Sequence, residues 1–179
     1  MENLKNLYLE QQQIITDKVA AIKHVDLWAE QISFLQEEHP FKAPAVFFAY
    51  RSNNITDIGL KVQQVNLQVD IYLYYETFAD TARASNKQTK ALDFLGLLTD
   101  INAVFHGLSG TYTKEMRRVG FAPVETGTSN LLYVQRYECY MFDEAAKVLS
   151  EHRLVNDVDV ERVPVPEPSG PQEIVIDME

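Results

Sequence analysis

The sequence predicts an α+β fold in which one antiparallel sheet of about four strands has helices packed on one face. Three observations support this prediction. The segment Gln64–Phe78 alternates apolar and polar residues, as a half-buried strand does. The segments Glu2–Lys23 and Thr89–Leu108 instead place their apolar residues at helical spacing. The predicted elements follow one another as helix, two strands, helix, two strands.

Length and charge indicate one folded domain followed by a tail. The chain has 179 residues and is 46% hydrophobic, which suffices for one good core, and we assign that core to residues 1–150. Residues 151–179 hold eight acids against Arg153 and Arg162, a net charge of −6, and are rich in proline. We expect this tail to be flexible. The remainder carries −4 of the total −10, which argues against a broad nucleic-acid-binding surface.

The first half of the chain predicts a helix and a hairpin. Residues 2–23 form an amphipathic helix without internal Gly or Pro. The segment 25–38 is either extended at its start or helical throughout, and the pattern does not decide between them. The run AVFFAYRS, residues 45–52, and the long strand then pair as a hairpin. Its turn is NNITDIG, residues 53–59, whose Asn, Asp and Gly content suits a turn.

The second half predicts a helix and a second hairpin. The apolar stripe of residues 89–108 ends at Gly107 and Gly110, and this helix should pack on the sheet. Two strands follow, Met116–Thr126 and Leu131–Asp143, which the short loop GTSN joins.

The long strand has two different faces. One is apolar and belongs to the core: Val65, Leu67, Val69, Ile71, Leu73 and Tyr75. The other carries Tyr72 and Tyr74 among amides and carboxylates. An antiparallel sheet can leave such a face to water. Tyrosine is also enriched at interfaces, so the alternative is a protein partner on this face.

Candidate chemical groups are few and scattered. His24, Asp26, His39, Asp100 and His106 form no dense ligand pattern, so we expect no metal, no cofactor and no catalytic residue. The phosphate-binding and hydrolase motifs GxxxxGK[ST], GxGxxG and GxSxG do not occur, and we predict that the protein is not an enzyme.

The single cysteine and the amino-terminal sequence indicate in which cellular compartment we expect the protein. Cys139 cannot form an internal disulfide and should be a small buried residue. The start MENLKNLYLEQQQ lacks the basic and apolar regions of a signal peptide, and no stretch reaches the length of a membrane span. We therefore expect a soluble protein that stays inside the cell that makes it.

Four segments carry a resemblance to a known family. They are IKHVDLWAEQISFLQEEHPFKAPAVFFAYRS, VNLQVDIYLYYETFAD, ALDFLGLLTDINAVFHGLSG and MRRVGFAPVETGTSNLLYVQRYECYMFD. Over about residues 20–143 the chain resembles the tail-completion or tail-terminator proteins of tailed phages, as found in prophages of Bacteroides-type bacteria.

The resemblance implies a structural virion protein. Such proteins are α+β sandwiches that form a six-membered ring, end the tail tube and face the head connector. The implied partners are further copies of the chain in a hexamer, the tail tube protein and head connector proteins, without a membrane. DNA would pass through the ring without specific binding. The implied locations are the host cytoplasm during assembly and the virion tail.

The interface hypothesis names five residues. Tyr72 and Tyr74 lie on the second face of the long strand, while Arg117, Arg118 and Glu125 lie in the second hairpin. Adjacent strand residues point to opposite faces, so at least one of the two arginines is displayed. It is either solvated or paired with a carboxylate of a neighbouring subunit.

Two alternatives remain open. Another head–tail joining or tube-like virion protein would share this architecture. In a different class, a small enzyme or ligand-binding domain would use Tyr72, Tyr74 and Tyr137 to line a pocket between sheet and helix.

Overall fold

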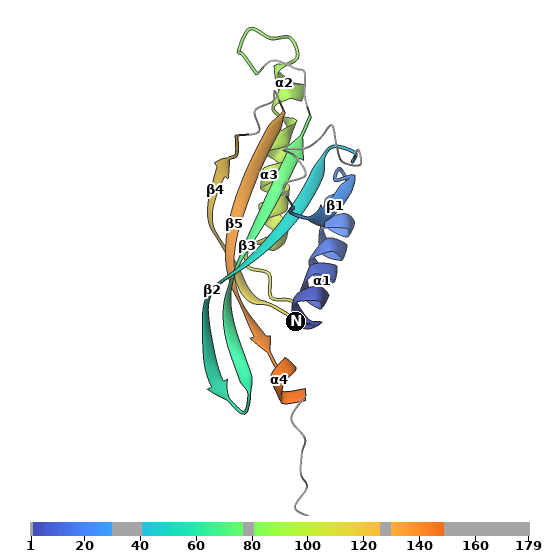
Figure 1. Cartoon of the computed structure of the whole chain (residues 1–179). Coiled ribbons are helices and arrows are strands. Elements are labelled where there is room, and N and C mark those ends of the chain that lie inside the picture. Colours follow the sequence, from blue (N-terminus) through green and yellow to red (C-terminus); the bar gives the residue numbers. More distant parts are fainter. Residues whose placement is uncertain (1, 30–40, 77–80, 126–129, 149–179) are drawn as a thin grey trace, which may run out of the picture.

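The structure is a computed structural model that describes residues 2–29, 41–76, 81–125 and 130–148 (Figure 1). In chain order its elements are α1 (Glu2–Lys18), β1 (His24–Leu27), β2 (Ala45–Gly59), β3 (Val62–Tyr75), α2 (Gln88–Ala91), α3 (Asp93–Phe105), β4 (Lys114–Pro123), β5 (Leu131–Asp143) and α4 (Ala145–Val148). The predicted tail, residues 151–179, and most of the GTSN loop lie outside the described residues.

The sheet is mixed and has five strands in the order β1-β2-β3-β5-β4. The prediction of about four antiparallel strands is therefore wrong in both strand number and pairing. The fifth strand, β1, pairs in parallel with Ala45–Phe48 of β2, while the other pairs are antiparallel. A four-residue strand shows too little alternation to be recognised, so only its contact with β2 defines it. Of the two alternatives for residues 25–38, the extended start is the right one, because β1 includes residues 25–27, while residues 30–38 lie outside the described residues.

The β2–β3 hairpin is longer than predicted. Strand β2 continues through NNITDIG to Gly59, and Leu60 and Lys61 form the turn with φ values of 53° and 61°. The predicted turn at residues 53–59 is wrong because cross-strand pairing with β3 outweighs the local preference of Asn, Asp and Gly. The outer half of this hairpin, residues 51–64, is called the arm below. In Figure 1 it extends well beyond α1 and α3, toward the end of the molecule where α4 lies.

The helices are shorter than their sequence patterns. Helix α1 ends at Lys18, not at Lys23, because the chain turns and the Lys23 amide bonds to the carbonyl of Pro44 at 2.9 Å. The predicted helix 89–108 is divided at Leu92 into α2 and α3. It ends before Gly107, whose φ of 84° suits only glycine, so the predicted helix stop is confirmed.

The main core lies between α1, α3 and one face of the sheet (Figure 1). The apolar alternation of the long strand is confirmed, because Val65, Leu67, Val69, Ile71 and Leu73 are buried in this core and Tyr75 packs against it. Cys139 is also buried here, as predicted. In the described part of the chain, no helix has the length and apolarity needed to cross a bilayer.

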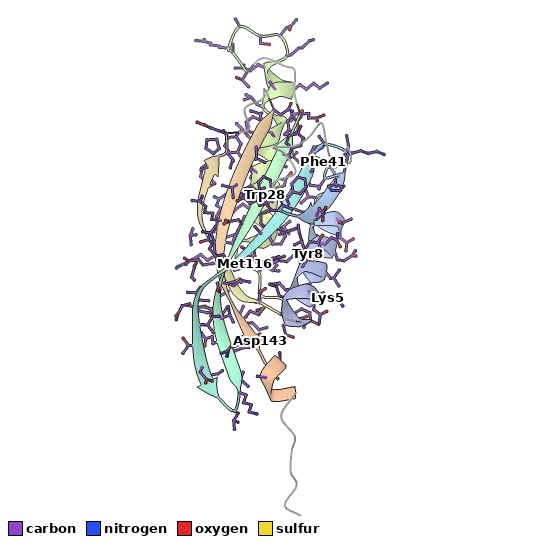
Figure 2. The ribbon with its side chains drawn as sticks, viewed as in Figure 1. Lys5, Tyr8, Trp28, Phe41, Met116 and Asp143 are labelled. Carbon is purple, nitrogen blue, oxygen red and sulfur yellow. The ribbon has the colours of Figure 1, made fainter. Side chains whose placement is uncertain are left out.

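A second, smaller core covers the upper end of the opposite sheet face. Its buried members are Ala45, Phe47, Tyr74 and Leu132, and packed against them are Trp28, Phe41, Ala43, Tyr72 and Val124. Figure 2 shows Trp28 and Phe41 at this end of the sheet. The chain thus covers part of the face that the sequence suggested for water or a partner.

Candidate functional site

The two tyrosines of the interface hypothesis are engaged within the chain. Tyr74 is fully buried, and its hydroxyl donates to Glu76 Oε1 at 2.9 Å and accepts from Asn130 Nδ2 at 2.8 Å. Burial, followed by the Glu76 contact, raises the pKa of Tyr74. Tyr72 stacks on Trp28 with ring centroids 4.2 Å apart. Tyr74 is therefore unavailable to a partner, and Tyr72 is only partly accessible.

Below these aromatic residues the same sheet face is open and charged. Cross-strand pairing places Arg51 opposite Gln68, Asp70 opposite Arg136, and Glu138 opposite both Gln68 and Arg117. These side chains come from four adjacent strands. We call this surface the arginine face, defined by Arg51, Gln68, Asp70, Arg117, Arg136 and Glu138.

One buried carboxylate lies at the centre of the arginine face. Asp70 is only 4% exposed and accepts a hydrogen bond from Gln68 Nε2 at 2.9 Å. The guanidinium nitrogens of Arg51 and Arg136 each lie 3.9 Å from its oxygens. A buried carboxylate needs such partners, because an isolated charge loses its hydration. Asp70 thereby holds two arginines near the centre of the open face without burying them.

The arginines themselves remain accessible. The side chains of Arg51, Arg136 and Arg117 are 71%, 53% and 70% exposed. Arg117 lies 3.6 Å from Glu138, and none of these contacts reaches the short distance of a bidentate pair. Exposed pairs of this kind add little to stability. The geometry instead suits recognition of an incoming carboxylate or phosphate, for which the planar guanidinium is well shaped.

Arg118 lies on the opposite, helix-covered face, in agreement with the alternation expected of adjacent strand residues. Its Nη1 donates to Gln135 Oε1 at 3.1 Å, and its guanidinium carbon lies 5.4 Å from the ring centre of Phe121. Gln135 is buried and also accepts from the Tyr137 hydroxyl at 3.0 Å. Arg118 is thus anchored to a buried polar network, whereas Glu125 is exposed just after β4. The structure brings Tyr72 and Arg117 to one face but not Arg118.

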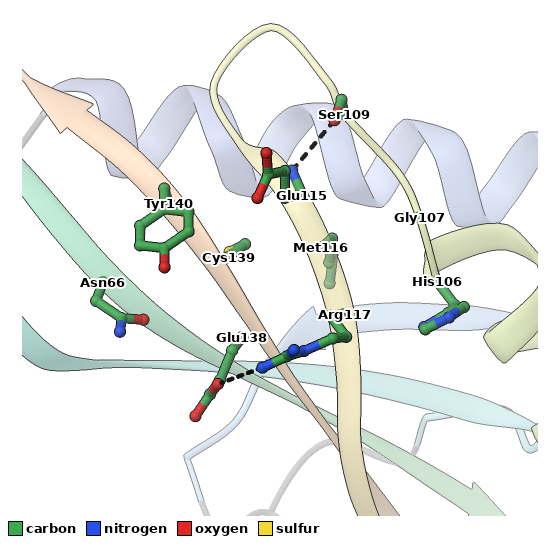
Figure 3. A pocket seen from close by; sticks show the side chains of 10 residues that line it. All are labelled: Asn66, His106, Gly107, Ser109, Glu115, Met116, Arg117, Glu138, Cys139 and Tyr140. Carbon is green, nitrogen blue, oxygen red and sulfur yellow. Dashed lines mark hydrogen bonds and ion pairs between the residues drawn. The ribbon is translucent and has the colours of Figure 1, made fainter.

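A pocket of about 410 Å³ opens between the start of β4 and β5 (Figure 3). The β4 strand bulges here at Glu115, whose φ is 55° and whose amide donates to Ser109 Oγ at 3.1 Å. Polar side chains including His106, Arg117 and Glu138 line the pocket, together with buried Cys139. Burial raises the pKa of Cys139 to about 12, so its thiol is not a nucleophile at neutral pH.

The other candidate chemical groups do not converge. His24 and Asp26 lie 3.9 Å apart on β1, Asp100 is exposed on α3, and His39 lies outside the described residues. His106 accepts a hydrogen bond from the Arg118 amide at its Nδ1, at 3.1 Å. In the described ranges no group of three His, Cys, Asp or Glu side chains is arranged to hold a metal ion.

Sequence reasoning missed two apolar surfaces at opposite edges of the sheet. On the arm, Ile55, Ile58 and Leu60 are 50%, 52% and 86% exposed. On β4, Val119 and Phe121 are 47% and 63% exposed, and Phe121 lies beside Leu95 of α3. Ile55 and Ile58 stand among the polar residues of the turn-like segment 53–59. These two apolar residues were the sequence signal that could have indicated an exposed apolar surface.

The arginine face was missed because its residues are far apart in sequence. Arg51, Asp70, Arg117 and Arg136 belong to separate strands, and only the register of the sheet brings them together. Comparison with known proteins adds no further site residue: no family model matches the chain, and no curated protein matches it.

Proposed function

We propose that this chain is a structural virion protein, a tail terminator or tail-completion subunit that forms a ring, ends the tail tube and joins it to the head connector. The resemblance of residues 20–143 to that family supports the proposal. The structural observation that carries it is the pair of exposed apolar surfaces on the arm and on β4, at opposite edges of one sheet.

Two different surfaces on opposite edges favour head-to-tail association. In such an arrangement the arm of one subunit contacts β4 of the next. If the rotation that relates neighbouring subunits returns to the first subunit after a whole number of steps, the assembly is a closed ring. The residues that take part are Ile55, Ile58 and Leu60 on the arm and Val119, Phe121 and Leu95 at the other edge. Arg118, whose guanidinium lies against Phe121, belongs to this second surface.

The contact at β4 is side-chain packing, not the addition of a strand. In the described residues no strand pairs with the outer edge of β4. Strand β4 has two irregularities in its pairing with β5, several charged residues and a terminal proline, Pro123, and such features discourage the addition of a further strand at its outer edge. The apolar side chains beside β4 can therefore make a specific contact with another subunit, while the edge of β4 itself disfavours the addition of further strands to the sheet.

The proposed ring acts by contact and not by catalysis. Its partners are other copies of the chain, the tail tube protein and head connector proteins, and no cofactor or metal is needed. Residues 1–150 carry a net charge of −4, which disfavours a tight grip on DNA phosphates that slide through the lumen. The arginine face would oppose that sliding if it lined the lumen uncovered.

Electron microscopy and native mass spectrometry of the full-length protein test this proposal. Six-membered rings are expected, and they should cap purified tail tubes at one end. Long tubes formed by the chain itself would indicate a tube-like virion protein instead. A chain that stays monomeric at high concentration and caps no tube would contradict the ring.

The pocket of Figure 3 favours a second candidate function, the binding of a small polar ligand. Its volume of about 410 Å³ lies in the usual range of ligand sites. The three tyrosines first considered for such a site, Tyr72, Tyr74 and Tyr137, are not among the residues that line it. A thermal-shift screen of small anions and metabolites, repeated with Glu138→Gln, would separate this function from a purely structural one.

A further inference from the structure

The arginine face carries a positive charge in a strongly acidic chain. Its three arginines face two carboxylates, Asp70 and Glu138, which leaves a net charge of +1 against −10 for the whole chain. The ion-pair distances of 3.6–3.9 Å exceed the usual 2.7–2.9 Å or so of a charge-assisted hydrogen bond. Each guanidinium therefore keeps donors that an additional carboxylate can use.

The surroundings of this face suit a peptide with both acids and apolar residues. Tyr140 and Phe142 follow Glu138 on the same side of β5 and are 38% and 43% exposed. At the other end, Tyr72 and Trp28 form the stacked pair. Guanidinium groups bordered by accessible rings recognise carboxylates and aliphatic side chains together.

The chain itself contains a segment with this composition. Residues 157–161, DVDVE, alternate acids with valines, so in an extended conformation all three carboxylates point to one side. Further acids follow up to Glu179, and the whole segment 151–179 carries −6.

We propose that the acidic C-terminal segment of the chain, residues 151–179, docks on the arginine face of the same molecule. The segment begins just after α4, which follows β5, the strand that carries Arg136 (Figure 1). From Asp143 back to Arg136 is seven residues along β5, or about 24 Å. The 31 residues after Val148 span up to about 100 Å when extended, so they reach the face easily.

Docking within one molecule is favoured over docking between molecules. A segment joined to the same chain as its site by a short connection has an effective concentration in the millimolar range. The docked acids would cover the guanidinium groups and keep them from phosphates and from acidic proteins. This inference concerns a surface separate from the apolar ring contacts and does not depend on ring formation.

Disulfide trapping in the full-length chain tests the docking. Ala49→Cys introduces a thiol at the centre of the arginine face, since Ala49 lies opposite Asp70. A second cysteine is placed in the segment, as Val160→Cys in one variant and Ser169→Cys in another. The native Cys139 is 1% exposed and should not react. Ala103→Cys, exposed on α3, replaces Ala49→Cys in the control pairs.

An intrachain disulfide should form at least about tenfold faster with Ala49→Cys than with Ala103→Cys, for one or both tail positions. In 0.5 M NaCl the difference should vanish, because the screening length falls to about 4 Å. The variant R51Q/R117Q should also abolish the difference in rate between the Ala49→Cys and Ala103→Cys pairs. The control variant K87Q/K90Q removes the same amount of charge from exposed positions around α2 and should leave that difference unchanged.

Three results would overturn the proposal. Equal trapping rates for Ala49→Cys and Ala103→Cys would show that the segment does not prefer this face. A preference that survives high salt and R51Q/R117Q would show that charge does not hold it there. Disulfide-linked dimers on a non-reducing gel, in place of the intrachain product, would assign the face to the tail of a second copy.

Discussion

Trp28 stacks on Tyr72 with ring centroids 4.2 Å apart and ring planes inclined by 9°. Trp28 follows β1 and Tyr72 lies in β3, so the stack connects two segments far apart in sequence. It closes the upper end of the open sheet face and marks the border of the arginine face. Trp28 is the only tryptophan of the chain and thus a reporter of this contact.

Replacing Tyr72 with Ala should destabilise the fold by about 1.5–3 kcal/mol, because the stack and part of the second core are lost. Denaturant unfolding followed by circular dichroism measures the loss, and Trp28 emission should change at the same time. Tyr72→Phe is the control, since it keeps the ring, and it should stay within about 0.5 kcal/mol. A loss below that value for Tyr72→Ala would mean that the stack does not hold the second core.

The Cys139 thiol should be unreactive in the folded protein. Burial raises its pKa from 9.0 to about 12, so thiolate is scarce at pH 8. Alkylation at that pH should proceed only as fast as the protein unfolds, and denaturant should accelerate it. Because the folded pKa is the raised one, this group stabilises the fold below about pH 9, and that contribution is lost as the pH rises toward about 12. Fast alkylation of the native protein would contradict the burial.

The turn of the arm can be stabilised by substitution. Leu60 and Lys61 both have positive φ, the geometry of a two-residue turn that prefers Asn-Gly. L60N/K61G should raise the free energy of unfolding by about 0.5–1.5 kcal/mol. It should also weaken ring formation, since Leu60 is 86% exposed and belongs to the proposed contact. A fall in stability in denaturant melts would contradict the positive-φ geometry of this turn.

Phe121→Asp should leave the subunit folded and abolish the proposed ring. Phe121 is 63% exposed, so the subunit loses little core, whereas a charge in an apolar contact is costly. Ile58→Asp on the arm should act in the same way. Leu9→Asp, at a position 48% exposed on α1, is the control and should still form rings. Native mass spectrometry reads the assembly state, and rings of Phe121→Asp would refute this contact.

The two adjacent arginines should respond differently to charge reversal. Arg118→Glu removes the donor to Gln135 and should cost about 1–3 kcal/mol. Arg117→Glu, at a side chain 70% exposed, should cost less than about 1 kcal/mol. Thermal and denaturant melts of both variants compare them directly. Equal losses would mean that Arg118 is not anchored in the buried network.

The sequence alone determined the elements whose patterns are long. Strand β5 has the predicted bounds Leu131–Asp143, and the apolar face of β3 packs in the core as its alternation indicates. Cys139 is buried, and Gly107 ends the helix. In the strands, ten or more residues repeat one spacing of apolar side chains. At Gly107, the residue type itself favours the positive φ that ends a helix. The local sequence is therefore enough to predict these features.

Three features depend on the tertiary structure alone. They are the presence of the fifth strand, the length of the arm, and the division of the sheet face opposite the main core into a covered aromatic end and the open arginine face. Strand β1 exists through its pairing with β2, and β2 extends through a turn-like sequence because β3 offers a partner. Tyr74 is buried since Phe41 and Phe47 cover it, whereas Arg51, Arg117 and Arg136 stay open around Asp70. These outcomes depend on contacts between residues distant in sequence, which no local pattern encodes.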